Sequence, residues 1–194
     1  MIRFIDNQLN RITMYRLVLY YLIFLLCVEF FISIADPSSD PFALALTVAF
    51  LLAVSAVTNR VFANIFKVPT NVESVYITAL ILALIITPVH SLHDLWFLAW
   101  AAVLANASKY IIAIKGKHLF NPAAFAVALT YFTIDQSASW WVGSGAMLVF
   151  VVLGGLLVVR KLGRFDMVLS FLIAALATIF VSSLFAGSDF ISST

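Results

Sequence analysis

Long apolar runs separated by short polar stretches dominate the sequence. The first run, Tyr15 to Ile34, has about 20 residues, which is the length that an α-helix needs to cross the hydrocarbon core of a bilayer. Six further apolar segments follow it along the chain. The pattern predicts an all-α, polytopic membrane helical bundle that takes up residues 1–194 as a single transmembrane domain. The seven predicted helices cover residues 15–34, 42–61, 75–89, 95–114, 122–134, 145–159 and 167–186.

The composition is that of a membrane protein. Of the 194 residues, 64% are apolar and 10% are charged, whereas soluble domains have about half and about a quarter. A net charge of +2 without a basic stripe argues against nucleic-acid binding. The single cysteine, Cys27, excludes an intrachain disulfide and a cysteine-cluster metal site. The three histidines, His90, His93 and His118, fall in loops at opposite ends of the predicted helices, which argues against a bis-histidine haem and against a metal site.

Basic residues lie on one side of the predicted topology. With a cytoplasmic N-terminus and seven crossings, all eleven Lys and Arg residues fall in or beside the inner loops. The charged residues of the outer loops are all acidic: Asp36, Asp40, Asp94, Asp135 and Asp189. This distribution obeys the positive-inside rule. We therefore predict a multi-pass protein with its N-terminus in the cytoplasm.

The fifth segment, 122–134, is too short to cross the hydrocarbon core without help. Asn121 is suited to cap a helix, and Pro122 is suited to its first position. A short helix that enters the membrane from a cap presents backbone N–H groups and the positive end of its dipole, which favour an anionic or carbonyl-bearing ligand. The alternative is a capped junction between loop and helix without a ligand. The sequence leaves both interpretations open.

Two charged residues, Lys109 and Glu29, fall inside predicted helices and away from their end positions. Lys109 lies in the fourth helix with Asn106 and Ser108 near it, and a lysine at the bilayer centre costs roughly 2.5–3.5 kcal/mol. Either Lys109 extends its amine to the inner interface, or it binds a phosphate, a carboxylate or the edge of a ring. Glu29 lies near the outer end of the first helix. There it is either interfacial or a site for a proton or another cation.

Several motifs together resemble a known family. The chain is similar to the flavin-carrying membrane subunits RnfD, of the Rnf complex, and NqrB, of the sodium-translocating NADH:quinone reductase. The similarity rests on Ser108-Lys109-Tyr110, on the string from Lys117 to Phe125 (KHLFNPAAF), and on the threonine-containing segment 76–88 that ends at Thr87-Pro88. The resemblance covers roughly residues 60–180. It implies the first half, and part of the second half, of a fold of about ten helices around bound flavin, in a bacterial inner membrane.

The resemblance implies a redox subunit rather than a complete enzyme. The expected partners are the lipid bilayer, an NAD(P)H- or ferredoxin-linked reductase and a quinone. In the family an FMN is attached to the threonine of a Ser-Gly-Ala-Thr motif, but the comparable stretch here is Ser144-Gly145-Ala146-Met147, and methionine has no hydroxyl. We therefore expect a non-covalent flavin, FMN or riboflavin. The candidate cofactor-binding residues are Thr78, Asn106, Lys109, His118, Asn121, Pro122 and Ser144.

Two other functions fit the same sequence features. A short helix that enters the membrane from a capped junction is also found in channels and transporters, so the chain is alternatively a channel-like protein for a small solute or an ion. A third interpretation is a membrane scaffold that docks a reductase. Flavin content, solute flux and co-purification with a partner distinguish the three.

Overall fold

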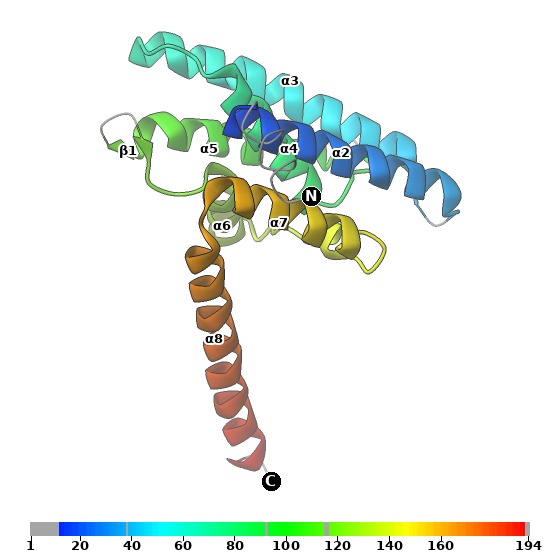
Figure 1. The fold of residues 1–194 in the computed structure, drawn as a ribbon. Helices are drawn as coiled ribbons and strands as arrows, with labels where there is room; N and C mark the ends of the chain where they lie inside the picture. The colour runs from blue at the N-terminus through cyan, green and yellow to red at the C-terminus, as the bar shows by residue number, and fades with distance from the viewer. Residues whose placement is uncertain (1–11, 38, 92, 115–116, 193–194) are drawn as a thin grey trace.

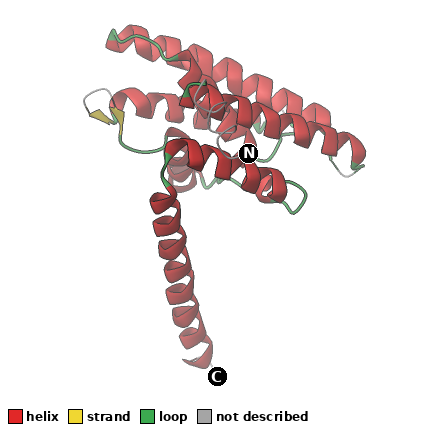
Figure 2. Ribbon diagram, viewed as in Figure 1, coloured by secondary structure: helices red, strands yellow, loops and turns green. Residues whose placement is uncertain are grey.

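The structure is a computed structural model that describes residues 12–37, 39–91, 93–114 and 117–192. This part of the chain is almost entirely helical (Figures 1 and 2). Its seven α-helices are α2 (Met14–Ala35), α3 (Pro41–Phe66), α4 (Val72–Ile85), α5 (Leu95–Ile111), α6 (Pro122–Ile134), α7 (Leu148–Leu162) and α8 (Phe165–Ser192). The two-residue strands β1 (Ala113–Ile114) and β2 (Lys117–His118) pair in antiparallel fashion, and a 3₁₀ turn, η1 (Trp141–Gly143), precedes α7.

Side-chain caps, two of them followed by a proline, set the starts of α3, α4 and α6. The carboxylate of Asp40 accepts hydrogen bonds from the first backbone N–H groups of α3, and Pro41 occupies the first helical position. Asn121 and Pro122 do the same at α6, as the sequence predicts. Asn71 caps α4 by accepting from the N–H of Ser74 at 3.1 Å. These caps satisfy N–H groups that a helix leaves without internal partners.

Several helix ends differ from the prediction. Helix α4 ends at Ile85 rather than Val89; the backbone is already extended at Ile86, ahead of Pro88, which cannot continue a helix. Helix α5 ends at Ile111 rather than Ile114, because the chain turns back there into the β1–β2 hairpin. The helix predicted at 145–159 lies at Leu148–Leu162, after the η1 turn. The predicted range 122–134 matches α6.

The core lies where α3, α4, α5 and α6 pack together. Leu51, Leu82 and Leu98 are fully buried there. Alanines line the contact between α5 and α6 and allow the two backbones to approach closely: Ala101, Ala102, Ala105, Ala123 and Ala126. Helices that pack this closely can be held together by van der Waals contacts, without the hydrophobic effect that drives packing in water.

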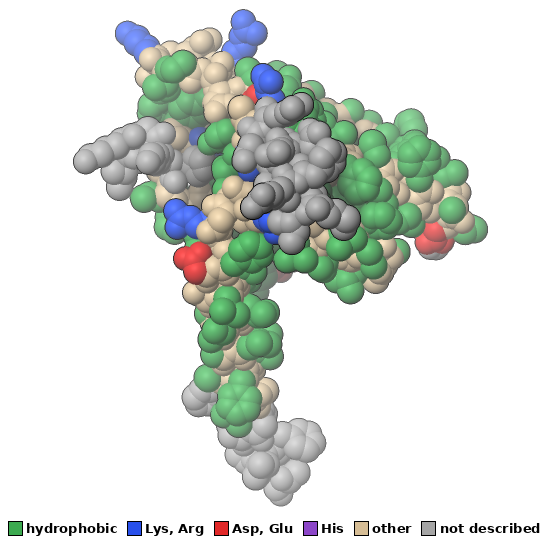
Figure 3. Space-filling model, in the orientation of Figure 1, with side chains coloured by type: hydrophobic (Ala, Val, Ile, Leu, Met, Phe, Trp, Pro, Cys, Tyr) green, Lys and Arg blue, Asp and Glu red, His purple; other side chains and the backbone are tan. Residues whose placement is uncertain are grey.

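Among the described residues, three helices are long and apolar enough to cross a membrane: α2, α3 and α8 up to Leu184. Their length and composition indicate a membrane protein. Helices α4, α5 and α6 are apolar but shorter. Helix α8 leaves the end of α7 and runs away from the other helices, and none of its apolar window is buried (Figure 1). Large hydrophobic side chains are exposed along its described part, and Figure 3 shows them in green.

Candidate ligand-binding cleft

Four helix ends meet at one end of the bundle. Arg16, near the start of α2, forms a salt bridge of 3.1 Å with Glu73, near the start of α4. Tyr110, near the end of α5, donates a hydrogen bond of 2.7 Å from its hydroxyl to the Oδ1 of Asn59 in α3. We call this the Lys109 end of the bundle. In Figure 3 the visible Lys and Arg side chains lie on the left and in the centre of the bundle, and none is visible at the opposite tip, where α2 and α3 meet.

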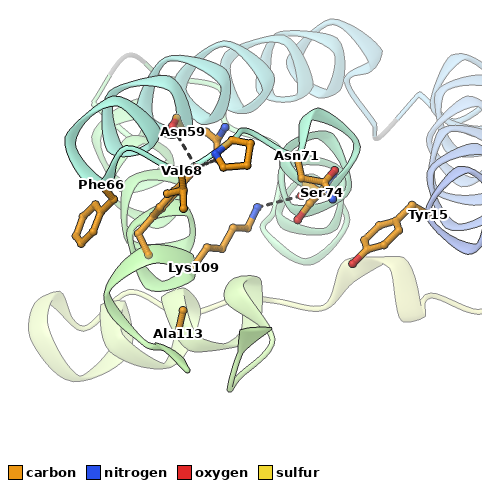
Figure 4. A pocket seen from close by; sticks show the side chains of 10 residues that line it. Tyr15, Asn59, Phe66, Val68, Asn71, Ser74, Lys109 and Ala113 are labelled. Carbon is orange, nitrogen blue, oxygen red and sulfur yellow. Dashed lines mark hydrogen bonds between the residues drawn. The ribbon is translucent and has the colours of Figure 1, made fainter. Parts of the chain in front are cut away.

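A cleft of about 640 Å³ opens at the Lys109 end. Sites for small organic ligands and cofactors usually have about 300–1,000 Å³. Side chains of α2, α3, α4 and α5 and of the loop between α3 and α4 meet here (Figure 4). The lining residues are Tyr15, Asn59, Phe66, Val68, Pro69, Asn71, Ser74, Lys109, Tyr110 and Ala113.

Lys109 extends across this cleft. Its side chain points toward α4, where the Nζ donates to the backbone carbonyl of Ser74 at 3.0 Å (Figure 4). A second, longer contact of 3.4 Å joins the Nζ to the Oδ1 of Asn106. Both acceptors are neutral, and within the described residues Lys109 forms no salt bridge. A half-buried ammonium with neutral partners favours an anionic or electron-rich ligand beside it.

Two stacked aromatic rings line the same cleft as the lysine. The rings of Phe66 and Tyr110 stack with centroids 5.8 Å apart and an interplanar angle of 29°. Phe62 completes the cluster, with its ring 5.9 Å from that of Tyr110. The hydroxyl of Tyr110 is held by Asn59, which fixes the orientation of its ring. A flat apolar surface next to a cation and several amide and carbonyl groups suits a planar ligand with a polar edge.

A second hollow, a groove of about 410 Å³, adjoins the cleft and shares Tyr15 and Ser74 with it. Thr78, Asn121 and Pro122 line this groove. The hydroxyl of Thr78 donates to the Ser74 carbonyl at 2.9 Å, so that one carbonyl accepts from both Thr78 and Lys109. Ser74 therefore links two candidate residues that are 31 positions apart in the sequence.

The start of α6 has few free donors for a ligand. Asn121 Oδ1 accepts from the N–H of Ala123 at 3.0 Å and, less closely, from that of Ala124 at 3.5 Å. The N–H of Phe125 bonds to the Asn121 carbonyl at 2.9 Å, and Pro122 has no N–H. These bonds fit a capped junction. A ligand at this helix start would meet the dipole but would have to displace the Asn121 side chain.

The remaining predicted site residues lie elsewhere. Asn106 is fully buried behind Lys109 and donates to the Ala102 carbonyl at 2.8 Å, so it reaches the cleft only through the lysine. Ser144 follows η1, which is tied to the other end of α4 by hydrogen bonds from the Trp141 indole. The structure therefore does not bring Ser144 to the Lys109 cleft. The backbone of His118 pairs with Ala113 in the hairpin, and its side chain lies outside the part that the structure describes.

Sequence reasoning missed much of the cleft wall. Asn59, Asn71, Tyr15, Phe66 and Tyr110 were not among the predicted site residues. Asn59 gave a signal, since it is an amide within a long apolar helix, where polar side chains need a partner. The aromatic residues gave none, because aromatic side chains near helix ends are ordinary in membrane proteins.

The comparisons with known proteins add no assignment. No family model matches the chain, and the searches of curated proteins and of solved structures gave no match.

Proposed function

We propose that the chain is a membrane-embedded electron-transfer subunit, similar to RnfD and NqrB, that holds a non-covalent flavin in the Lys109 cleft. The observation that carries this proposal is the half-buried ammonium of Lys109 with neutral partners, in a cleft that the stacked rings of Phe66 and Tyr110 also line. The motif Ser108-Lys109-Tyr110, on which the resemblance rests in part, contributes two of these groups.

The residues of the cleft fit a flavin. Tyr110 and Phe66 offer an apolar face for the isoalloxazine ring. Lys109 offers a cation for the electron-rich edge of the ring or for a phosphate, and the amides of Asn59 and Asn71 offer further hydrogen bonds. A bound flavin would supply one- and two-electron transfer, which no side chain of the cleft supplies. We keep the expectation that the flavin is not covalent, since Met147 is fully buried and its thioether cannot form a phosphoester.

We further propose that the Lys109 end faces the bacterial cytoplasm. Arg16, Arg60 and Lys67 lie at this end, as the positive-inside rule requires of a cytoplasmic surface. An NAD(P)H- or ferredoxin-linked reductase would then reach the cleft from the aqueous side, and a quinone would reach it from the bilayer. For all seven helices to cross one bilayer, α8 has to swing alongside α7, and the turn at Gly163 is where the chain would pivot.

The test is flavin binding by the purified protein. Absorption spectra before and after acid precipitation show whether flavin is present and whether it is released. We expect flavin in the supernatant, and Lys109→Gln to weaken rebinding of added FMN or riboflavin by roughly 10-fold or more, since a hydrogen bond to a charged group contributes about 1.5–3 kcal/mol. Arg60→Gln removes an exposed cation from α3 and serves as the control. Folded protein that holds no flavin and takes up none would contradict the proposal.

One observation favours the channel-like alternative. Thr47, Ser55 and Asn59 follow one face of α3 at multiples of four residues, and all three are buried. The Oγ of Ser55 has no hydrogen-bond partner among the described residues. Buried polar side chains on one helix face are found along polar paths through membrane proteins. Flux of a small solute or ion in liposomes that contain this chain alone, abolished by Ser55→Leu, would support a channel over a redox subunit.

A further inference from the structure

Glu29 lies on the face of α2 that turns toward the other helices. The buried residues of α2 are Leu22, Leu25, Leu26 and Ser33. Glu29 falls between them at helical spacing, three residues after Leu26 and four before Ser33. Its side chain is accordingly half-buried, whereas Cys27, two positions earlier, is exposed. The glutamate is therefore part of the packed face of the helix and not of the surface that faces lipid.

The glutamate has no compensating partner. Within the described part of the chain it takes part in no hydrogen bond and no ion pair. The other glutamate of the protein, Glu73, contrasts with it, since Glu73 is paired with Arg16. Glu29 also lies six residues before the end of α2, which is about 9 Å along the helix at 1.5 Å per residue. Glu29 therefore lies inside the candidate span rather than at its tip.

Other titratable groups are too far along the helices to neutralise a carboxylate here. The acidic residue that follows α2 is Asp36, seven positions after Glu29. The helices packed against α2 are α3, α4 and α7. Their titratable side chains lie toward the helix ends: Asp40 before α3 and Arg60 on it, Glu73 and Tyr76 on α4, and Arg160 and Lys161 on α7. Of these, Asp40 is also acidic, and it caps α3 next to the α2–α3 loop.

From this placement we propose that Glu29 is a proton-binding site inside the membrane. Its carboxyl holds a proton at neutral pH and exchanges it with the side of the membrane where Asp36 and Asp40 lie. A carboxylate in this position would be an unpaired charge in an apolar environment, where such groups become neutral instead. The chemistry is the uptake of one proton by one carboxylate, and it needs no other reactant. The proposal does not depend on flavin binding at the Lys109 cleft.

The first test uses dicyclohexylcarbodiimide, an apolar reagent that adds to protonated carboxyl groups. The protein is labelled in liposomes at pH 7, and the modified peptides are identified by mass spectrometry. We expect Glu29 to be modified many times faster than Glu73, which serves as an internal control, and the modification to be lost in Glu29→Gln. Equal modification of both glutamates would overturn the proposal. Protection of Glu29 by sodium ions at constant pH would also overturn it, in favour of a metal-cation site.

The second test reads the protonation state directly and does not require reagent access. The infrared difference spectrum between the unmodified protein and Glu29→Gln contains either the C=O band of a carboxylic acid or the paired bands of a carboxylate. At pH 7 we expect the carboxylic acid band. The carboxylate bands would mean that Glu29 is ionised and reaches water, and the proposal would fail. Because Gln has nearly the same shape as protonated Glu, the variant is expected to fold.

Discussion

The phenol ring of Tyr21 in α2 lies directly over the α-carbon of Gly154 in α7. A Cβ atom built at Gly154 would collide with three atoms of that ring. The hydroxyl of Tyr21 donates a hydrogen bond of 2.8 Å to the Val151 carbonyl, one turn before the glycine. This contact brings the two helices close together at Gly154, where there is no room for a Cβ atom unless the Tyr21 ring moves.

The adjacent glycine, Gly155, provides a matched comparison, because a Cβ there meets nothing within 4 Å. We expect Gly155→Ala to stabilise the protein by about 0.5–1 kcal/mol, since alanine is the better helix former. Gly154→Ala should instead destabilise it by about 1–3 kcal/mol through overpacking. Thermal unfolding in detergent measures both. Two melting temperatures that move in the same direction would show that α7 does not pack on Tyr21 in this way.

The Asn121 cap of α6 predicts how substitutions at this position change the stability of the protein. Asn121→Ala removes the oxygen that accepts from Ala123 and Ala124, and we expect a loss of about 1 kcal/mol in stability. Asn121→Asp, which keeps an accepting oxygen, should restore the stability. Asn64→Ala, at an exposed position of α3, is the control. If Asn121→Ala weakened flavin binding beyond what its stability explains, the start of α6 would be a ligand site as well as a cap.

We predict that the stability of the folded protein depends on pH through the carboxyl group of Asp40. Hydrogen bonds from the backbone N–H groups of Ala43 and Phe42, together with His90 at 3.3 Å, lower the pKa of Asp40 below its ordinary value of 3.8. A lowered pKa means that the ionised form is favoured in the folded state. The stabilisation is therefore fully present above pH 3.8 and is lost as the pH falls through the lower, folded-state pKa.

The measurement is the melting temperature between pH 6 and pH 3, for the unmodified protein and for Asp40→Asn. The unmodified protein should lose stability in the acidic part of this range, and Asp40→Asn, which keeps a capping oxygen but does not titrate, should lose less. Asp40 is solvent-exposed, so the difference is expected to be small and to shrink in high salt. Identical pH profiles would contradict the role of the Asp40 carboxylate.

The sequence predicted the helices better than the site. Runs of apolar residues mark each helix from α2 to α8, because every one of them must be apolar enough to pack or to meet lipid. The helix ends were predicted less accurately, because a local feature such as a proline decides where a helix stops. Pro88 ends α4, but an apolar run continues past it, so hydropathy alone extended the helix to Val89.

The cleft was only partly predictable, for a physical reason. Lys109 is conspicuous, because a charge in an apolar helix needs an explanation. Its partner is the backbone carbonyl of Ser74, and a carbonyl is present at every position, so the sequence could not single it out. Ser144 shows the opposite error. It was included because of a short motif, and η1 holds it at the far end of α4.

Labelling of single cysteines tests the proposed orientation. Cys27, the only natural cysteine, is first replaced by alanine. Ser39→Cys places a thiol in the α2–α3 loop, and Thr70→Cys places one in the α3–α4 loop, which adjoins the cleft. If the basic end is cytoplasmic, a maleimide that cannot cross membranes labels Ser39→Cys in intact spheroplasts, whereas Thr70→Cys reacts only after the cells are permeabilised. The reverse pattern would place the cleft outside the cytoplasm, where no NAD(P)H- or ferredoxin-linked reductase could reach it. Labelling of both positions in intact spheroplasts would mean that α3 does not cross the bilayer, despite its 26 residues.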